Sequence, residues 1–466
     1  MGNDANTRAV VLGGSLAGLF AARVLADAYD EVVIVDRDEL IDVEGPRRGC
    51  PQGKHINGLM TRGQMAMEEM YPGITTEIFE DGTPQGDLAG TVRWYALGKH
   101  LRQQPAGMIC VAASRPMLEK HVRQRTQALG NVIFLERHDI LGLVATPERS
   151  KITGVRVQSL DGEGVEEVLD ADLVVDATGR GSRTPIWLED LGYQRVVEDR
   201  KKIGLGYGTQ HYRLRTDPYD GDLSINTIAH PKLPRGAIFT KTDGGRVELT
   251  VYGILGDHPP TDQQGYYDFV KSLGIPEIYE AVIAAEPLDE PTAFRFPTTL
   301  RRRYEDMDRF PDGLLVVGDA VTCFNPIYAG GMTVAAMSAL VMRGHLHSGA
   351  APQPLQYFRD LARDVIDPPW EVTHAVDLGF PGVEGERTFS VRMRQVMTNL
   401  IYRAGTRDSR VTAAYFRVAG QVERPETLMK PKFLLRVLLA AAGLSKVREA
   451  KGHWTWTGEK AKVPSL

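Results

Sequence analysis

The stretch AVVLGGSLAGLFAARVL, residues 9–25, joins a short apolar run, a glycine turn and a helical pattern. Residues 9–12 predict a buried strand, and apolar side chains at positions 16, 19, 20 and 24 recur at the spacing of an amphipathic helix. The run EVVIVD then predicts a second strand that ends at Asp36. This order of strand, turn, helix and strand is typical of a βαβ unit that binds a dinucleotide.

Each part of this unit has a physical role in such a site. Gly13 permits the tight turn out of the strand, and Gly18 lets the helix pack close to the sheet. The helix N-terminus offers free N–H groups to a pyrophosphate, and Asp36 can accept ribose hydroxyls. We therefore predict that the adenosine and pyrophosphate are bound by Gly13, Gly14, Ser15, Ala17, Gly18, Asp36 and Arg37.

A second informative stretch is VVGDAVTCFNPIYAGGMTVAA, residues 316–336. It predicts a strand that reaches Asp319, an irregular bend that contains Pro326, and an apolar helix that begins at Gly330 and Gly331. A carboxylate at a strand end and a helix N-terminus built from glycines can both approach a ligand closely. This stretch is therefore a second candidate part of the same site.

Composition narrows the class of protein. The chain has 466 residues, 42% of them hydrophobic, and a net charge of -5, which offers no basic field for nucleic acid. The three cysteines are widely spaced and predict no metal site, in keeping with a reducing, cytoplasmic location. No apolar stretch reaches the roughly 20 residues that span a bilayer, so we expect no transmembrane segment.

The order of patterns along the chain predicts an α/β protein with an inserted sheet. Three strand-like runs, DILGLVAT, KITGVRVQSL and VEEVLD, lead into DATGRG at 176–181, and longer alternating runs fill residues 200–260. We predict a Rossmann-like, three-layer nucleotide-binding domain with a β-meander, an antiparallel β-sheet substrate domain that interrupts it, and a helical C-terminal region with breaks at its prolines. The predicted boundaries are 1–70, 106–195 and 286–350 for the first domain, 71–105 and 196–285 for the second, and 351–466 for the helices.

The early GGSLAG, the meander before DATGRG and the late GDA followed by a helix resemble the class A FAD-dependent monooxygenases of the para-hydroxybenzoate hydroxylase fold. The resemblance covers residues 8–345 and implies FAD bound in an extended form. It implies that Asp319 binds the ribityl hydroxyls and that the backbone at the helix start faces the flavin ring. The cofactor contacts implied in this half are Gly179, Asp319, Pro326, Gly330, Gly331 and Met332.

A narrower resemblance lies in RRGCPQGKH at 47–55, FNPIYAGGM at 324–332 and DPPW at 367–370. These stretches are similar to the bacterial epoxidases of polyether biosynthesis and, more distantly, to squalene epoxidases. The resemblance implies that Arg48 and Gln52 lie along the cofactor and that Arg115 reaches its ribityl or phosphate region. It leaves His55 open between cofactor contact and packing. Ala329 stands where that branch usually has glycine.

The implied reaction is insertion of one oxygen atom from O2, through a C4a-hydroperoxyflavin, into an apolar natural-product substrate. We expect alkene epoxidation first, with aromatic hydroxylation or flavin-dependent reduction of isoprenoid double bonds as alternatives. Electrons would come from NAD(P)H or from a partner flavin reductase. The chain would act as a monomer or homodimer.

No catalytic residue is assigned from the sequence. Epoxidation by an activated flavin needs no protein base, whereas hydroxylation of a phenol benefits from a group that removes the ring hydroxyl proton. Tyr207, His211 and Tyr212 on the predicted substrate sheet are the candidates for that group, although such residues on a half-buried strand usually serve packing.

Overall fold

The computed structural model describes residues 7–162, 164–346, 351–445 and 456. A parallel sheet in the order β18-β11-β1-β2-β7 forms the centre of the nucleotide-binding half. Its strands are short apolar runs, and most of their residues are buried, because both faces of the sheet are covered. They span Arg8–Leu12 (β1), Glu31–Val35 (β2), Val132–Leu135 (β7), Leu173–Asp176 (β11) and Leu314–Val316 (β18).

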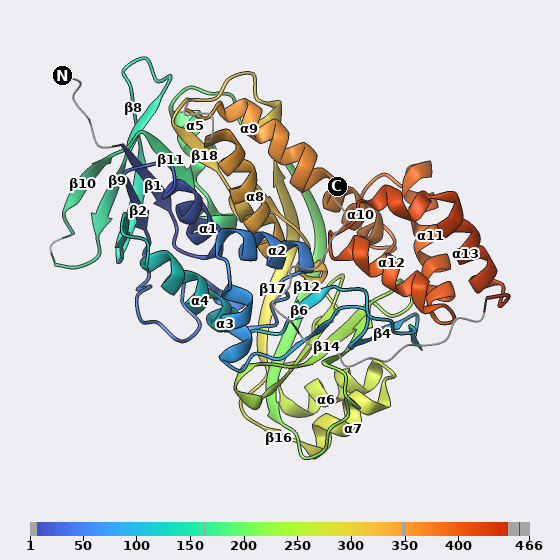
Figure 1. The fold of residues 1–466 in the computed structure, drawn as a ribbon. Helices are drawn as coiled ribbons and strands as arrows, with labels where there is room; N and C mark the ends of the chain where they lie inside the picture. The colour runs from blue at the N-terminus through green and yellow to red at the C-terminus, as the bar shows by residue number, and fades with distance from the viewer. Residues whose placement is uncertain (1–6, 163, 347–350, 446–455, 457–466) are drawn as a thin grey trace.

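Helices cover one face of this sheet and a β-meander packs on the other (Figure 1). On the helical side, α1 packs against both α4 and α8. On the other side, apolar residues of β9 belong to the same core as the parallel strands. The expected three-layer, Rossmann-like arrangement with a meander is thus confirmed. The bounds are Leu16–Leu25 (α1), Arg115–Gln127 (α4), Gly331–Leu346 (α8), His138–Ala145 (β8), Ile152–Ser159 (β9) and Glu166–Asp170 (β10).

The second sheet is mainly antiparallel and is larger than the sequence indicated. Its path is β19-β17-β12-β15-β14-β13-β4-β5, and β16 pairs with β12. Strands from beyond residue 285 extend it, and β4 joins it in parallel with β13. The domain boundaries themselves stay a prediction. The strands span Val92–Ala96 (β4), Lys99–His100 (β5), Glu198–Arg213 (β12), Ser224–Ile228 (β13), Arg235–Lys241 (β14), Val247–Gly253 (β15), Glu286–Pro287 (β16), Thr292–Arg302 (β17) and Thr322–Cys323 (β19).

Helices lie on both sides of this large sheet. Gln263–Ser272 (α6) and Pro276–Ala284 (α7) pack on one face through a separate apolar core. The C-terminal helices pack against the end of the sheet near β4, where the rings of Trp94 and Phe416 stack with centroids 4.6 Å apart. Figure 1 shows α10 to α13 far from the meander, whereas α9 packs against α8 over the parallel sheet. Their bounds are Pro354–Leu361 (α9), Asp367–Asp377 (α10), Phe389–Gly405 (α11), Ser409–Ala419 (α12) and Pro431–Ala441 (α13).

The helical character of residues beyond 351 is confirmed, but one expected break is wrong. Pro368 and Pro369 lie in the first turn of α10, which follows α9 through a π-helical turn at Ala362–Ile366. The wider turn changes the hydrogen-bond pattern just where the prolines offer no N–H, so the chain stays helical from 354 to 377.

The remaining elements are short and connect the two sheets. They are Thr61–Met70 (α2), Ile74–Glu80 (α3), Gln85–Asp87 (β3), Ile109–Val111 (β6) and Thr184–Asp190 (α5). Among the described residues, no helix is both long enough and apolar enough to cross a membrane.

Candidate functional site

The turn between β1 and α1 requires its glycines. Gly13 has a φ of 100°, and a Cβ there would lie 2.8 Å from the carbonyl oxygen of Ala177. A Cβ on Gly18 would lie only 1.8 Å from the carbonyl oxygen of Gly13, so the helix could not approach the turn. The turn therefore has the close packing and the exposed helix N-terminus that a pyrophosphate site needs.

Asp36 lies beside this turn, at the end of β2. One of its carboxylate oxygens accepts a hydrogen bond from the Gly14 N–H at 2.6 Å, and the other accepts one from the Asp38 N–H at 2.8 Å. Burial raises the pKa of Asp36, although these two bonds oppose that rise. Arg37 points toward the meander instead, where its guanidinium pairs with Asp139 at 2.6 Å. The turn and Asp36 are thus brought together, while Arg37 has a separate partner.

A buried ionic cluster lies beside the turn between β1 and α1. Glu119 on α4 pairs with Arg115 at 3.0 Å and with Arg47 at 3.1 Å, and it also accepts a hydrogen bond from the Ser15 hydroxyl. Arg115 donates to the Ser15 hydroxyl at 2.9 Å. Burial opposes ionisation of Glu119, but Arg115 and Arg47 hold its pKa down at about 2. The cluster fixes Ser15 and places the cation of Arg115 near the helix N-terminus.

Arg47 and Arg48 are neighbours in the chain. The sequence resemblance assigns Arg48 to the cofactor, whereas the structure buries Arg47 and exposes Arg48. Arg47 also reaches Asp38 at 3.1 Å, so its charge is fully used within the protein. Arg48 is exposed, and among the described residues its side chain has no hydrogen-bond or ion-pair partner. Gln52 lies in the short helix Pro51–Lys54, which packs beside α4. Arg48 is therefore available to an anion, while Arg47 is structural.

The late motif meets the early one across the sheet. A Cβ on Gly318 would lie 2.9 Å from the Cβ of Ala17, and Gly179 faces the side chain of Asp319. A Cβ on Gly331 would lie 3.6 Å from Oδ1 of Asp319, so this carboxylate lies at the start of α8. Three sequence motifs separated by more than a hundred residues each therefore line one continuous path.

Several polar groups along this path lack a partner within the described part of the chain. The carboxylate of Asp319 accepts no hydrogen bond there, and burial raises its pKa. One buried terminal nitrogen of Arg180 makes no hydrogen bond, although its guanidinium lies 4.8 Å from the ring centroid of Phe296. Together with the free N-termini of α1 and α8, these groups fit a ligand that carries phosphates, hydroxyls and a polar ring edge.

The loop before α8 is conformationally unusual. Ala329 has a φ of 51°, which is the left-handed region that glycine adopts without strain. Gly330 and Gly331 follow it, and Met332 behind them is buried. Pro326 begins the short helix Pro326–Tyr328 in the same loop. The loop thus presents bare backbone at the helix start.

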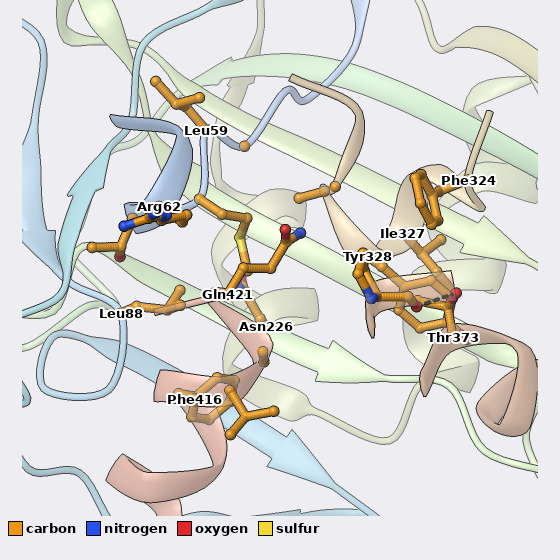
Figure 2. Close-up of a pocket in the computed structure, with 18 of the residues that line it drawn as sticks. Leu59, Arg62, Leu88, Asn226, Phe324, Ile327, Tyr328, Thr373, Phe416 and Gln421 are labelled. Atoms are coloured by element: carbon orange, nitrogen blue, oxygen red, sulfur yellow. Dashed lines mark hydrogen bonds between the residues drawn. The ribbon is translucent and has the colours of Figure 1, made fainter. Parts of the chain in front are cut away.

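A cavity of about 340 Å³ adjoins this loop (Figure 2). Its walls include the loop at Pro326–Gly330, the segment 56–62 that enters α2, strand β6, the large sheet at β4, β13, β14 and β15, and the C-terminal helices α10, α11 and α12. Most of the lining is apolar, including Leu59, Leu88, Ile327 and Phe416. An apolar chamber with few polar groups, next to a cofactor path, has the character of a substrate pocket.

The three residues considered as proton acceptors do not line this cavity. Tyr207 is buried against the rings of His55 and Phe294, His211 pairs with Asp289 at 2.7 Å, and Tyr212 is fully buried. All three lie on β12, but none of them belongs to the lining of the cavity. His55 is buried too, and its ring nitrogen Nδ1 lies 2.8 Å from the Thr209 hydroxyl, which favours packing.

A different tyrosine does lie in the cavity wall. The hydroxyl of Tyr328 donates to Asp377 at 2.8 Å, and the amide of Asn325 donates to the same carboxylate oxygen at 3.0 Å. Burial raises the pKa values of both Tyr328 and Asp377. Asp377 is at the end of α10, so no short sequence motif contains both partners. No residue pattern in the sequence marks this pair, apart from the position of Tyr328 in the glycine loop.

Comparison with known proteins agrees with this geometry. Residues 6–346 match the family model described as FAD binding domain. The chain is 33% identical over 376 residues to Protein Rv3254 of Mycobacterium tuberculosis, covering 77% of this chain and 76% of that protein. The chain therefore belongs to the FAD binding domain family.

Solved structures place the fold in the same class. A flavoprotein/dehydrogenase from Cytophaga hutchinsonii is similar with a TM-score of 0.65 and 15% identity, over 94% of this chain and 98% of that chain. PqsL, a probable FAD-dependent monooxygenase from Pseudomonas aeruginosa, is similar with a TM-score of 0.59 and 17% identity, over 81% and 98%. At these identities the similarity shows the fold, which is that of FAD-dependent monooxygenases.

Proposed function

We propose that this chain is an FAD-dependent monooxygenase that inserts one oxygen atom from O2 into an apolar small molecule, with alkene epoxidation as its first reaction. The observation that carries the proposal is the apolar cavity of about 340 Å³, whose wall includes the loop at Pro326–Gly330 beside the start of α8. A substrate held there would lie against the part of the loop assigned to the flavin ring.

The residues named above would supply contacts for each part of FAD. Asp36 would hold the ribose of the adenosine, and Asp319 would hold the ribityl chain. The N-terminus of α1, together with Arg48, would bind the pyrophosphate. The backbone at Gly330–Met332 would face the ring, where a helix N-terminus favours negative charge. Bound FAD supplies the capacity to take two electrons, from NAD(P)H or from a flavin reductase, and to activate O2.

The protein itself would exclude water and position the substrate. The C-terminal helices close the cavity on the side away from the parallel sheet, because residues of α10, α11 and α12 belong to its lining. Exclusion of water protects an oxygen-activating site from unproductive hydrogen peroxide release. An alkene needs no protein base in this reaction, so the apolar lining suffices for epoxidation.

Aromatic hydroxylation is a second candidate because of Tyr328 and Asp377. The Tyr328 hydroxyl donates its proton to Asp377, so its oxygen can accept a hydrogen bond from a phenol in the cavity. The phenol proton would move to the Tyr328 oxygen as the Tyr328 proton moves to the carboxylate. Burial raises the pKa of Asp377, which makes this carboxylate a better proton acceptor than an exposed one.

The decisive experiment supplies labelled oxygen. The FAD-loaded protein is given NADPH, or NADH with a flavin reductase, under ¹⁸O2 with panels of apolar alkenes and phenols, and products are analysed by mass spectrometry. We expect products heavier by one ¹⁸O atom, with epoxides from the alkenes. Reduction of a double bond without incorporation of ¹⁸O would instead support the reductase alternative and refute oxygen insertion.

The Tyr328→Phe variant separates the two oxygenation candidates. Loss of the hydroxyl breaks the proton path to Asp377, so we expect phenol turnover to fall by about 100-fold, within the usual range for general base catalysis. Epoxidation of alkenes should change by less than about threefold, because the cavity keeps its shape. Equal effects on both substrate classes would show that Tyr328 shapes the cavity and does not relay protons.

A further inference from the structure

One end of the cavity carries a cation and two amide side chains. Figure 2 shows Arg62, Gln421 and Asn226 together on one side, while Phe324, Ile327 and Tyr328 lie on the other. Arg62 lies in the first turn of α2, and its backbone N–H donates to the carbonyl oxygen of Gly420 at 3.3 Å. The polar end is therefore built from three segments: α2, strand β13 and the residue pair that follows α12.

Charge in the cavity wall is not balanced at this end. Of the two acidic residues in the lining, Asp364 pairs with Arg363 at 2.6 Å and Glu423 pairs with Arg417 at 2.6 Å. The half-buried side chain of Arg62, by contrast, makes no ion pair or hydrogen bond within the described part of the chain. A guanidinium in a largely apolar chamber without a counter-charge is costly unless a ligand supplies one.

The two neighbouring amides add donors that are not used elsewhere. Asn226 is only 6% exposed, and its side-chain oxygen accepts a hydrogen bond from the Ser224 hydroxyl at 2.5 Å, so its NH2 group remains for a ligand. Gln421 has a left-handed backbone with a φ of 60°, and its Nε2 lies 3.6 Å from the position of a Cβ on Gly330. The polar end therefore adjoins the loop assigned to the flavin.

We propose that Arg62, with Asn226 and Gln421, binds a carboxylate on the substrate, so that the enzyme acts on apolar monocarboxylic acids whose carbon skeleton extends toward Tyr328. The inference rests on the proposed function, because it names the substrate class of the same cavity. A carboxylate matches the planar fork of a guanidinium with two parallel hydrogen bonds. Arg424 also belongs to the lining, but it is exposed, so one half-buried guanidinium would face one negative charge, which favours a carboxylate over a phosphate dianion.

Calorimetric binding to the FAD-loaded protein tests this without turnover. The probes are matched pairs that differ only in charge: decanoate with decanamide, and 2-naphthoate with 2-naphthamide. We expect the wild-type protein to bind at least one acid tenfold or more tightly than its amide. Equal affinity within both pairs, or no binding of either acid, would overturn the proposal.

Variants then assign the preference to Arg62. Arg62→Gln should weaken acid binding by tenfold or more and leave amide binding within about threefold, and Arg62→Lys should retain part of the preference. Arg403→Gln, an exposed arginine on α11 outside the lining, is the matched control and should bind like the wild type. Flavin absorbance and the melting temperature establish that each variant is folded and loaded. An undiminished acid preference in Arg62→Gln would refute the assignment.

The outcome is separable from that of the oxygenase proposal. If acids bind with the expected preference but no ¹⁸O enters any product, the carboxylate site stands and the monooxygenase proposal fails. If ¹⁸O enters neutral alkenes and acids show no preference, the monooxygenase proposal stands and the carboxylate site fails.

Discussion

The path assigned to FAD and the cavity beside it are built in different ways. The path consists of backbone turns and strand ends, such as Gly13 with its φ of 100° and Asp36 directly after β2. The cavity consists of side chains that meet from α2, the large sheet and the C-terminal helices. The first depends on local conformation, and the second depends on how distant segments pack.

This difference predicts different responses to mutation. A backbone turn has almost no freedom to relax, because a Cβ on Gly18 would overlap the carbonyl of Gly13. A cavity wall made of several side chains can adjust, because no single residue carries the whole surface. Changes on the cofactor path should therefore abolish flavin binding, while changes in the cavity should alter only which substrates bind.

The largest effect is expected for Gly18→Ala. The added Cβ would lie 1.8 Å from the Gly13 oxygen, so α1 must move away from the turn. We expect FAD affinity to fall by at least about 100-fold, which corresponds to about 3 kcal/mol, measured by titration of the apoprotein with FAD. Gly130→Ala is the control, because a Cβ there meets no atom within 4 Å. Normal flavin content in Gly18→Ala would contradict the assigned path.

Glu119→Gln should have the next largest effect, on stability. The change leaves the buried charges of Arg47 and Arg115 without their shared carboxylate, at a cost of about 3 kcal/mol in the free energy of unfolding. Urea unfolding at neutral pH measures this loss. Asp161→Asn, which alters an exposed pair with Arg137, should change stability very little. A similar small change for Glu119→Gln would show that the cluster is not needed for the fold.

The pH dependence of the free energy of unfolding should also reflect the ionisation of Glu119 in this cluster. The folded pKa of Glu119 is about 2, below its ordinary value of 4.5, so its contribution is complete above pH 4.5 and is lost as pH falls toward 2. His55 is buried as the neutral ring, with a pKa of about 4 against 6.5, so its contribution is lost between pH 6.5 and 4. The contributions of His55 and Glu119 should therefore be lost over different pH ranges, and the difference in stability between the wild type and Glu119→Gln should shrink only below pH 4.5.

The smallest effect is expected for Val372→Trp on α10. The larger side chain fills part of the cavity and should weaken binding of bulky substrates by about tenfold, a cost typical of overpacking. FAD affinity should stay the same, because Val372 belongs to the cavity wall and not to the path. Val372→Ala enlarges the cavity and should preserve binding of the same substrates. A loss of flavin in Val372→Trp would show that path and cavity are not independent.

Most of the cofactor path could be predicted from the sequence, because its parts are local. Gly13, Gly18 and Asp36 lie within one βαβ unit. Asp319 belongs to a recognisable motif, although the strand expected to reach it ends at Val316 and Asp319 lies in the short helical turn Gly318–Ala320. Their approach to one another follows from the parallel sheet, whose strands all end on the same side. The sequence cannot show which of the adjacent residues Arg47 and Arg48 is available to the cofactor, because the two differ only in their burial in the folded chain.

The cavity could not be predicted in the same way. Tyr207, His211 and Tyr212 fall on a strand with alternating faces, and one sequence cannot show which face meets the chamber. The partner of Tyr328 is Asp377, and Arg62 meets Gly420 from more than 350 residues away. Such contacts depend on the docking of the C-terminal helices, which no periodicity or motif specifies.

The sequence by itself thus determined the α/β class and the FAD binding domain. It also located the glycines and aspartates that we assign to the cofactor, because backbone geometry at a turn is set by the few residues that form it. Tertiary structure alone decided the depth and polarity of the cavity, the burial of Arg47 and the isolation of Arg62. Burial and charge balance are properties of the packed molecule, since they depend on every segment that surrounds a side chain.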